Sequence, residues 1–185
     1  YTKVAQVVAE ELQIDIDRIR VSAADTSKVP NASATAASTG ADLNGKAAQD
    51  AAHKVRQRIA QQVAARAGGS AEDVVFMQGR VRCGTLDESF DAAVAQAYQA
   101  RVQLWSDGFY ATPGLHWDRA TLTGRPFYYF AYGAAVSEVV VDTLTGEWKL
   151  LRADVLHDVG RSLNPALDIG QVEGAFIQGM GWLTM

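Results

Sequence analysis

Small side chains directly precede one of the predicted helices. Residues 34–52, ATAASTGADLNGKAAQDAA, place small and hydroxyl-bearing residues before an alanine-rich helical pattern. Small side chains let an anion approach backbone N–H groups, and the N-terminus of a helix attracts negative charge. The hydroxyls of Ser38 and Thr39 can add hydrogen bonds. One interpretation is therefore a phosphate-bearing ligand; the other is that Ser38, Thr39 or Asp42 simply caps the helix.

Glycines are concentrated in a second predicted helix, at residues 170–181, GQVEGAFIQGMG. Each glycine should cost this helix about 1 kcal/mol relative to alanine, so close packing is expected to offset the loss. Gly170, Gly174 and Gly181 lie on one narrow face, and Gln178 lies on the same face. The face can accept a flat ligand, or it can pack against another helix while main-chain groups satisfy the Gln178 amide.

Histidine and cysteine residues predict no metal site and no nucleophile. The three histidines, His53, His116 and His157, are far apart and lack the spacing of metal ligands. The single cysteine, Cys83, has no CxxC partner and is predicted to be a buried thiol.

Carboxylate pairs also predict no acid–base couple. Glu10–Glu11 and Asp87–Glu88 are interpreted as a solvated helix face and a helix start. Asp154 and Asp158, near the end of a predicted hairpin, are expected to cap loops. We therefore assign no catalytic residue and no metal ligand.

Hydrophobic periodicity predicts three helices before the glycine-rich one. They cover residues 1–13, 42–67 and 89–102. The helix over 42–67 has the clearest pattern, and Gly68–Gly69 is expected to end it. Its apolar row repeats every four residues: Leu43, Ala47, Ala51, Val55, Ile59 and Val63.

Extended structure is predicted in several other segments. Residues 18–25 suggest a strand, residues 73–83 one or two short strands, and residues 103–114 an extended segment. Residues 127–142 and 147–160 are rich in β-branched and aromatic side chains and predict a long hairpin.

The glycine-rich helix is expected to begin near NPALD, and two caps are possible. Either Asn164 caps it with Pro165 in the first position, or Asp168 caps it with Gln171 reaching back. Strands interleaved irregularly with helices favour an α+β fold, with helices packed on a mixed or antiparallel sheet.

Bulk properties restrict the class of protein. The 185 residues are 48% hydrophobic and 21% charged, which is typical of a globular domain. A net charge of −4 argues against nucleic acid as a partner. A single cysteine suits the cytoplasm, and no apolar run is long enough for a membrane span. Because predicted helices start at Tyr1 and stop at Met185 without capping signals, we expect residues 1–185 to be one segment of a longer chain.

The sequence resembles the molybdenum-binding part of the xanthine dehydrogenase/oxidase family. The resemblance is carried by VPNASATAASTGADLNGKAAQDA and by AYGAAVSEVVVDTLTGEWKLLRADVLHDVGRSLNPALDIGQVEGAFIQGMGWLTM, with ARVQLWSDGFYATPGLHWD between them. It covers essentially the whole chain, in the same order. It implies a fold that belongs to the cofactor-binding domain of that family.

The resemblance also implies a cofactor, molybdopterin, which carries molybdenum, and a set of residues that contact it. Thr35, Ala36, Ala37 and Ser38 match the stretch that lines the pterin and its phosphate, and Gln178 matches a glutamine beside the pterin-dithiolene. At Gly40 and Ala41 relatives often carry hydroxyl residues, so backbone donors are expected to hold the phosphate here. Val136 replaces a cysteine found in some relatives.

The implied enzyme is a xanthine dehydrogenase that hydroxylates xanthine or hypoxanthine with water and passes electrons through 2Fe-2S clusters and FAD to NAD. Those clusters, the FAD, a glutamate base and the purine clamp match nothing in residues 1–185, so partner domains or subunits are implied and the segment alone is expected to be inactive. Two alternatives stay open: a related molybdenum hydroxylase acting on another N-heterocycle or an aldehyde, and a non-catalytic assembly domain.

Overall fold

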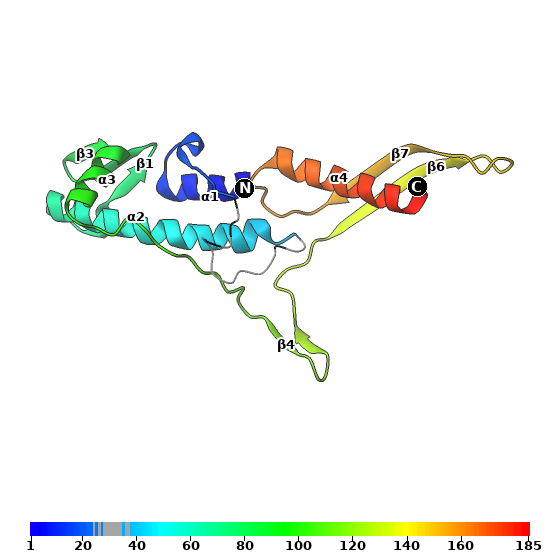
Figure 1. Cartoon of the computed structure of the whole chain (residues 1–185), viewed down its shortest axis with the longest axis horizontal. Coiled ribbons are helices and arrows are strands. Elements are labelled where there is room, and N and C mark those ends of the chain that lie inside the picture. The colour runs from blue at the N-terminus through cyan, green and yellow to red at the C-terminus, as the bar shows by residue number, and fades with distance from the viewer. Residues whose placement is uncertain (24, 26, 28–34, 36–37) are drawn as a thin grey trace. The chain divides into compact units, whose positions relative to one another are not determined.

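The chain folds into two compact units, residues 1–112 and 113–185, each considered by itself. The computed structural model describes residues 1–23, 25, 27, 35 and 38–185 (Figure 1). Within these residues it has four α-helices and seven β-strands, and the strands form three antiparallel sheets. The predicted α+β class is confirmed, with antiparallel pairing throughout the strands described here.

Helix α2 (Gly45–Ala67) is the central element of the first unit. Helix α1 (Thr2–Leu12) packs against it, and a π-helical turn (Gly40–Asn44) leads into it. The C-terminal half of its predicted apolar row, Val55, Ile59 and Val63, contributes to the core, where Ile59 and Val63 are fully buried. The helix ends at Gly68, which takes a left-handed φ of 71° that costs glycine little. The predicted helix end is therefore confirmed.

A three-stranded antiparallel meander covers the C-terminal half of the first unit. It consists of β1 (Val75–Met77), β2 (Arg80–Cys83) and β3 (Leu86–Ser89), in spatial order 1-2-3. Helix α3 (Phe90–Gln99) follows at once, and the Ser89 hydroxyl caps it by accepting a hydrogen bond from Ala92 N at 3.1 Å. One or two short strands were predicted over 73–83, and two are present; the third helix is confirmed, and Cys83 is buried as predicted.

Two predictions of secondary structure for this unit are wrong. Residues 18–25 form no strand in the part that the structure describes. A 3₁₀ turn (Ile16–Arg18) includes the first of them, Arg18, which forms an ion pair with Asp91 of α3. Asp87 and Glu88 do not start a helix but lie in β3. The sequence suggested a helix start because two adjacent charged residues hide the alternation that is typical of a strand. Ion pairs with arginines hold both carboxylates in β3.

The first unit ends in an irregular segment, residues 102–112, which we call the strap. Figure 1 shows the strap running back along α2. Its even-numbered residues are half-buried and its odd-numbered residues are exposed, throughout its length. This alternation is the burial pattern of an extended chain with one covered face, as predicted for residues 103–114.

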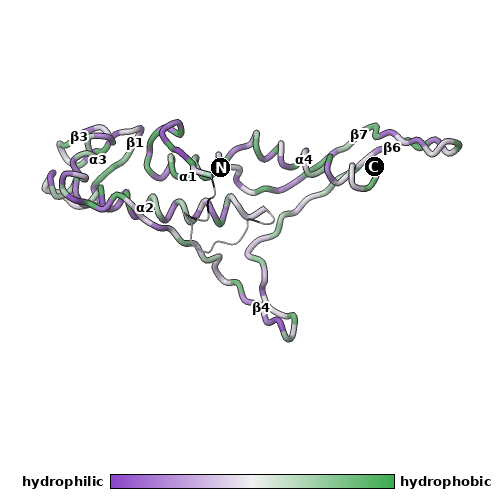
Figure 2. Tube along the Cα trace, viewed as in Figure 1, coloured by the Kyte–Doolittle hydropathy of each residue, from purple (hydrophilic) through white to green (hydrophobic). Residues whose placement is uncertain are grey.

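The second unit contains a long hairpin, β6 (Gly133–Val141) and β7 (Trp148–His157), with a bulge at Glu138/Val139. A two-stranded ribbon, β4 (His116–Asp118) and β5 (Thr123–Arg125), precedes it, and helix α4 (Pro165–Thr184) follows it. The predicted hairpin and final helix are confirmed; the β4–β5 ribbon was not predicted. Figure 2 shows hydrophobic stretches in both units.

Candidate cofactor-binding site

The predicted phosphate-binding stretch lies before α2 in the first unit. Thr35 and Ser38 are both exposed. The Thr35 hydroxyl accepts a hydrogen bond from Asn44 Nδ2 at 3.4 Å, which links it to the π-helical turn. Ala36 and Ala37, which the resemblance also implies, lie outside the described residues. The structure thus gives the predicted stretch two accessible hydroxyl groups beside a helix start.

The π-helical turn and α2 both lack a capping hydrogen bond from the side chain at their N-cap positions. Thr39 occupies the N-cap position of the π-helical turn, and Asn44 that of α2, yet neither side chain makes a capping hydrogen bond. The predicted capping by Thr39 is therefore wrong. Backbone N–H groups in the first turn of a helix have no carbonyl partner within the helix. These are the N–H groups that a ligand at this end of the helical segment would use.

The predicted glycine face lies on α4 in the second unit. Asn164 caps this helix, accepting from Leu167 N at 3.2 Å, with Pro165 in the first position. Asp168 instead accepts a hydrogen bond from the Ser162 hydroxyl. The Asn164–Pro165 alternative is confirmed.

Space is open along that face of α4. A Cβ added to Gly170 or Gly174 would meet nothing within 4 Å, whereas one on Gly181 would lie 3.1 Å from the flexible end of Met185. Gln178 is exposed. Within the second unit, all of which the structure describes, no helix covers Gly170 or Gly174. The packing that should offset the cost of these glycines therefore does not come from residues 113–185.

A cluster that was not predicted joins α1 to α2. Glu11, expected to be solvated, has a side chain only 10% exposed, and this prediction is wrong. Its Oε1 lies 2.9 Å from His53 Nδ1 and 3.3 Å from Arg56 Nη1. Burial opposes ionisation of Glu11, but hydrogen bonds from His53, Gln49 and Arg56 outweigh it and lower the pKa. The sequence held only a weak signal for this cluster, a carboxylate pair in one predicted helix and the basic residues of HKVRQR, 53–58, in the next.

Other polar residues have structural partners. Asp87 binds Arg80 and Arg82 at 2.8 and 3.2 Å, and Glu88 binds Arg66. In the second unit, Asp158 accepts from Gly160 N at 2.8 Å, as a loop cap should. Asp154, predicted to cap a loop, lies instead within β7. It forms an ion pair with Arg152, at 2.7 Å.

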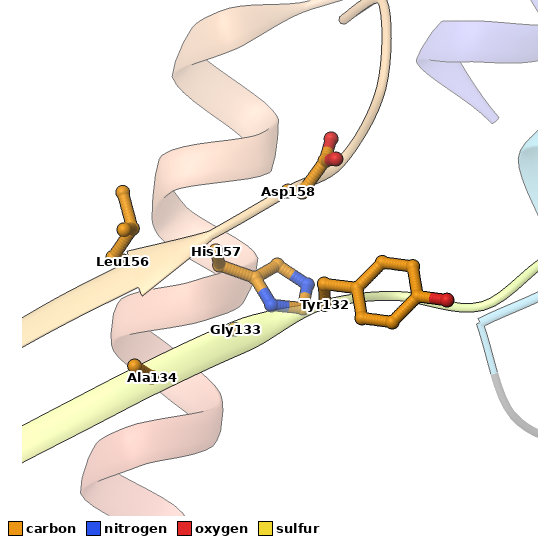
Figure 3. Close-up of a pocket in the computed structure, with 6 residues that line it drawn as sticks. All are labelled: Tyr132, Gly133, Ala134, Leu156, His157 and Asp158. Carbon is orange, nitrogen blue, oxygen red and sulfur yellow. The ribbon is translucent and has the colours of Figure 1, made fainter.

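The open end of the hairpin carries a groove of about 380 Å³. Figure 3 shows its lining, in which the His157 ring lies beside Gly133 and Tyr132. None of the predicted site residues lines it. Among the described residues, no cluster of three or more His, Cys, Asp or Glu side chains is arranged to hold a metal ion. No helix in the same residues has the length and apolar character needed to span a bilayer.

Comparison with known families now adds to this geometry. The family described as the molybdopterin cofactor-binding domain matches residues 1–185, the whole chain. The chain therefore belongs to the molybdopterin cofactor-binding domain family.

Individual relatives agree with this assignment. The chain is 43% identical over 185 residues to xanthine dehydrogenase/oxidase of Mus musculus and 42% identical to xanthine dehydrogenase of Oryza sativa subsp. japonica. Each alignment covers 100% of this chain but 12% of the relative. The predicted membership of the xanthine dehydrogenase/oxidase family is confirmed, and the chain spans only a small part of these relatives.

Solved structures share the fold. Quinoline 2-oxidoreductase from Pseudomonas putida 86 matches with a TM-score of 0.69 and 25% identity, over 94% of this chain and 22% of that one. CO dehydrogenase from Oligotropha carboxidovorans matches with a TM-score of 0.73 and 23% identity, over 94% and 21%. The latter identity supports a common fold and nothing further.

Proposed function

We propose that this chain binds molybdopterin in a xanthine dehydrogenase that hydroxylates xanthine or hypoxanthine with water and transfers electrons to NAD. The observation that carries the proposal is a helix start just after Ser38 that lacks a side-chain N-cap hydrogen bond, in a chain that belongs to a molybdopterin-binding family. The remainder of the molybdenum-binding chain, the 2Fe-2S clusters and the FAD belong to other parts of the proposed enzyme, which we place in the cytoplasm.

The first unit is suited to the phosphate of the cofactor. Backbone N–H groups at the start of the π-helical turn point outward along the helix axis, and the helix dipole favours an anion there. Thr35 and Ser38 add exposed hydroxyl donors. We propose that Ala36 and Ala37 contribute close backbone approach, because a methyl side chain leaves the N–H groups accessible.

The second unit is suited to a flat ring. The open face at Gly170 and Gly174 lets a planar group approach the helix backbone, and Gln178 follows one turn later on the same face. Its amide has both donors and an acceptor, so it can bind the heteroatoms of a pterin-dithiolene. We propose that Gln178 orients the cofactor.

Bound molybdopterin supplies the redox chemistry of the hydroxylation. The residues named here bind and orient it; none is assigned a role in proton transfer. Since the proposed base and purine clamp match no residue in 1–185, we expect this segment alone to have no turnover.

The test uses the full-length enzyme. We expect Gln178→Ala to lower the cofactor affinity about tenfold, the loss expected for one hydrogen bond to a charged group. Metal analysis and pterin fluorescence after oxidation, both measured following gel filtration, report retained cofactor. Gln178→Glu should lower retention at least as far, because its carboxylate repels the anionic dithiolene.

Thr184→Ala is the matched control on α4. The Thr184 hydroxyl donates to the Met180 carbonyl at 2.7 Å, so its loss removes a polar group that is already satisfied within the helix. Retention should stay at the wild-type level in this variant. Wild-type retention in Gln178→Ala would refute the assignment of Gln178, and wild-type enzyme free of molybdenum and pterin would favour the assembly-domain alternative.

A second candidate is a hydroxylase of another N-heterocycle. It is favoured by the fold shared with quinoline 2-oxidoreductase, at 25% identity. Turnover of xanthine and quinoline by the full-length enzyme, with NAD reduction followed by absorbance, separates the two candidates. A preference for quinoline would overturn the proposed purine substrate but leave the proposed cofactor role intact.

A further inference from the structure

Two basic side chains of α2 bind backbone carbonyls of the strap. Arg58 Nη1 donates to the carbonyl oxygens of Trp105, at 2.9 Å, and Gln103, at 3.3 Å. One turn earlier, Lys54 Nζ donates to the carbonyl oxygen of Asp107 at 3.3 Å. These three carbonyls come from alternate residues, which present their polar groups on the same edge of an extended chain.

Another turn earlier, an acid replaces the bases. Asp50 Oδ2 accepts from the backbone N–H of Phe109 at 3.0 Å, and it also accepts from Lys54 Nζ at 2.7 Å. Asp50, Lys54 and Arg58 thus form a line at i, i+4 and i+8 on α2, which we call the charged row. The two basic members donate hydrogen bonds to backbone carbonyls, and the acidic member accepts one from a backbone N–H.

The spacing of the two elements explains why the charged row fits the strap. Four helical residues rise about 6 Å, and two extended residues span about 6.6 Å. Each turn of α2 therefore advances by nearly the same distance as each alternate residue of the strap. A shift of the strap by one residue would turn its bonding edge away from the charged row.

Gly108 restricts the strap to the same register, because only a residue without a side chain fits at its position against α2. A Cβ on Gly108 would lie 1.9 Å from the carbonyl oxygen of Ala47 and 2.8 Å from the N atom of Ala51. A shift by two residues would bring Ser106 or Tyr110 to this contact, and neither side chain fits against the helix backbone. The charged row and Gly108 therefore specify one register.

We propose that the charged row is a positioning device, which fixes the register of the strap on α2 and so holds the start of α2 in the orientation that binds the cofactor. This inference rests on the proposed function. Asp50 and the Ala47 contact lie in the first two turns of α2, immediately after the π-helical turn. On another side of these turns, Glu11 of α1 accepts from Gln49 at 3.3 Å.

The electrostatics of Asp50 suit this role. The hydrogen bond from Lys54, followed by that from Phe109 N, lowers the Asp50 pKa below its ordinary value. The carboxylate is accordingly ionised at neutral pH and is a strong acceptor for the backbone N–H.

Hydrogen exchange in the full-length enzyme tests the register. We expect Asp50→Ala to reduce the protection of the Phe109 amide about tenfold, and Asp50→Asn, which retains an acceptor oxygen, to restore part of it. Gly108→Ala should reduce it as well, because the added methyl pushes the strap off α2 while the charged row stays intact. Unchanged Phe109 protection in Asp50→Ala and Gly108→Ala would overturn the proposed register.

Molybdenum and pterin retention in the same proteins tests the positioning. We expect retention to fall severalfold in Asp50→Ala and Gly108→Ala and to recover in Asp50→Asn. Asp87→Ala is the matched control, because Asp87, like Asp50, is a surface carboxylate paired with a basic side chain, but it lies in β3, away from the strap. Equal loss of retention in Asp87→Ala would show general destabilisation and overturn the positioning role.

Failure of this inference can be distinguished from failure of the proposed function. Wild-type retention in Asp50→Ala, together with lost Phe109 protection, overturns the positioning role and leaves the cofactor role standing. Wild-type enzyme without molybdenum or pterin overturns the proposed function and the positioning role together, while the exchange measurement still decides the register.

Discussion

The two units of the chain use hydrophobic residues in opposite ways. In the first unit, α2, α3 and the meander enclose a core whose most deeply buried members are Ile59, Val63, Val81, Cys83, Ala93 and Ala97. Residues 113–185, every one of which the structure describes, include no buried residue. Phe127, Phe130 and Trp182 are 61, 66 and 85% exposed.

The strand pattern of β6 shows what this difference means. Val139, Val140 and Val141 are consecutive, so their side chains point to both faces of the hairpin, and each is at least 50% exposed. Strands with two apolar faces are normally covered on both sides, and a lone hairpin is only marginally stable in water. We infer that the second unit is built to be covered by polypeptide outside residues 113–185, whereas the first unit contains its own core.

The largest expected effect is on solution behaviour. We expect isolated residues 1–185 to self-associate and to bind a hydrophobic dye, because large exposed apolar surfaces mark missing partners. Residues 1–112 should be monomeric and bind much less dye. Light scattering coupled to gel filtration measures both proteins. A monodisperse, cooperatively melting 1–185 monomer would remove the contrast between the units.

This contrast was only partly predictable from the sequence. Local patterns predicted α2, its end at Gly68, the β6–β7 hairpin and the Asn164 cap, because these depend on periodicity and on neighbouring residues. The prediction of a strand over residues 18–25 was wrong, because a strand needs a pairing partner and an alternating sequence does not show whether one is present. β3 was missed because its two charged residues, Asp87 and Glu88, were interpreted as a helix start, whereas their arginine partners on β2 and α2 stabilise them in a strand.

The candidate site was predictable by resemblance more than by pattern. Pattern singled out the small residues before α2 and the face with Gln178, but the family motif assigned Thr35–Ser38 and Gln178 to a cofactor, and these contacts stay predictions. The charged row was missed, although Asp50, Lys54 and Arg58 stand at helical spacing, because nothing local indicates that an extended segment some 50 residues later lies against them. A row of charges on a helix is ordinarily a solvated face.

A smaller effect is expected on the free energy of unfolding, when one phenylalanine in each unit is replaced by alanine. Phe76 is 5% exposed, packs edge-on to Phe90 at 6.5 Å, and lies under the Arg56 guanidinium. Phe76→Ala should cost about 3–5 kcal/mol of unfolding free energy. Phe130→Ala should cost less than about 0.5 kcal/mol in residues 1–185, since its ring is already solvated. Urea titration at low protein concentration measures both.

The same two variants should also be measured in the full-length protein, where the costs in unfolding free energy can be compared with those in residues 1–185. There we expect Phe130→Ala to become destabilising, because the ring should then be covered, while the cost of Phe76→Ala stays similar. If Phe130→Ala is as costly as Phe76→Ala already in dilute residues 1–185, the second unit has a core of its own and the contrast is wrong.

The smallest expected effect concerns acid stability, which should involve the first unit through Glu11. Its folded pKa is lowered from the ordinary value of 4.5, so the ionised carboxylate stabilises the folded state above that pH. This contribution should disappear as the pH falls through the lower, folded pKa. Glu11→Gln should lower the melting temperature at neutral pH and flatten its decline below about pH 4.5, followed by circular dichroism.

The adjacent Glu10→Gln, on the exposed side of α1, is the control. An equally steep acid decline in Glu11→Gln would mean that the buried contact between α1 and α2 does not set the acid limit of the first unit.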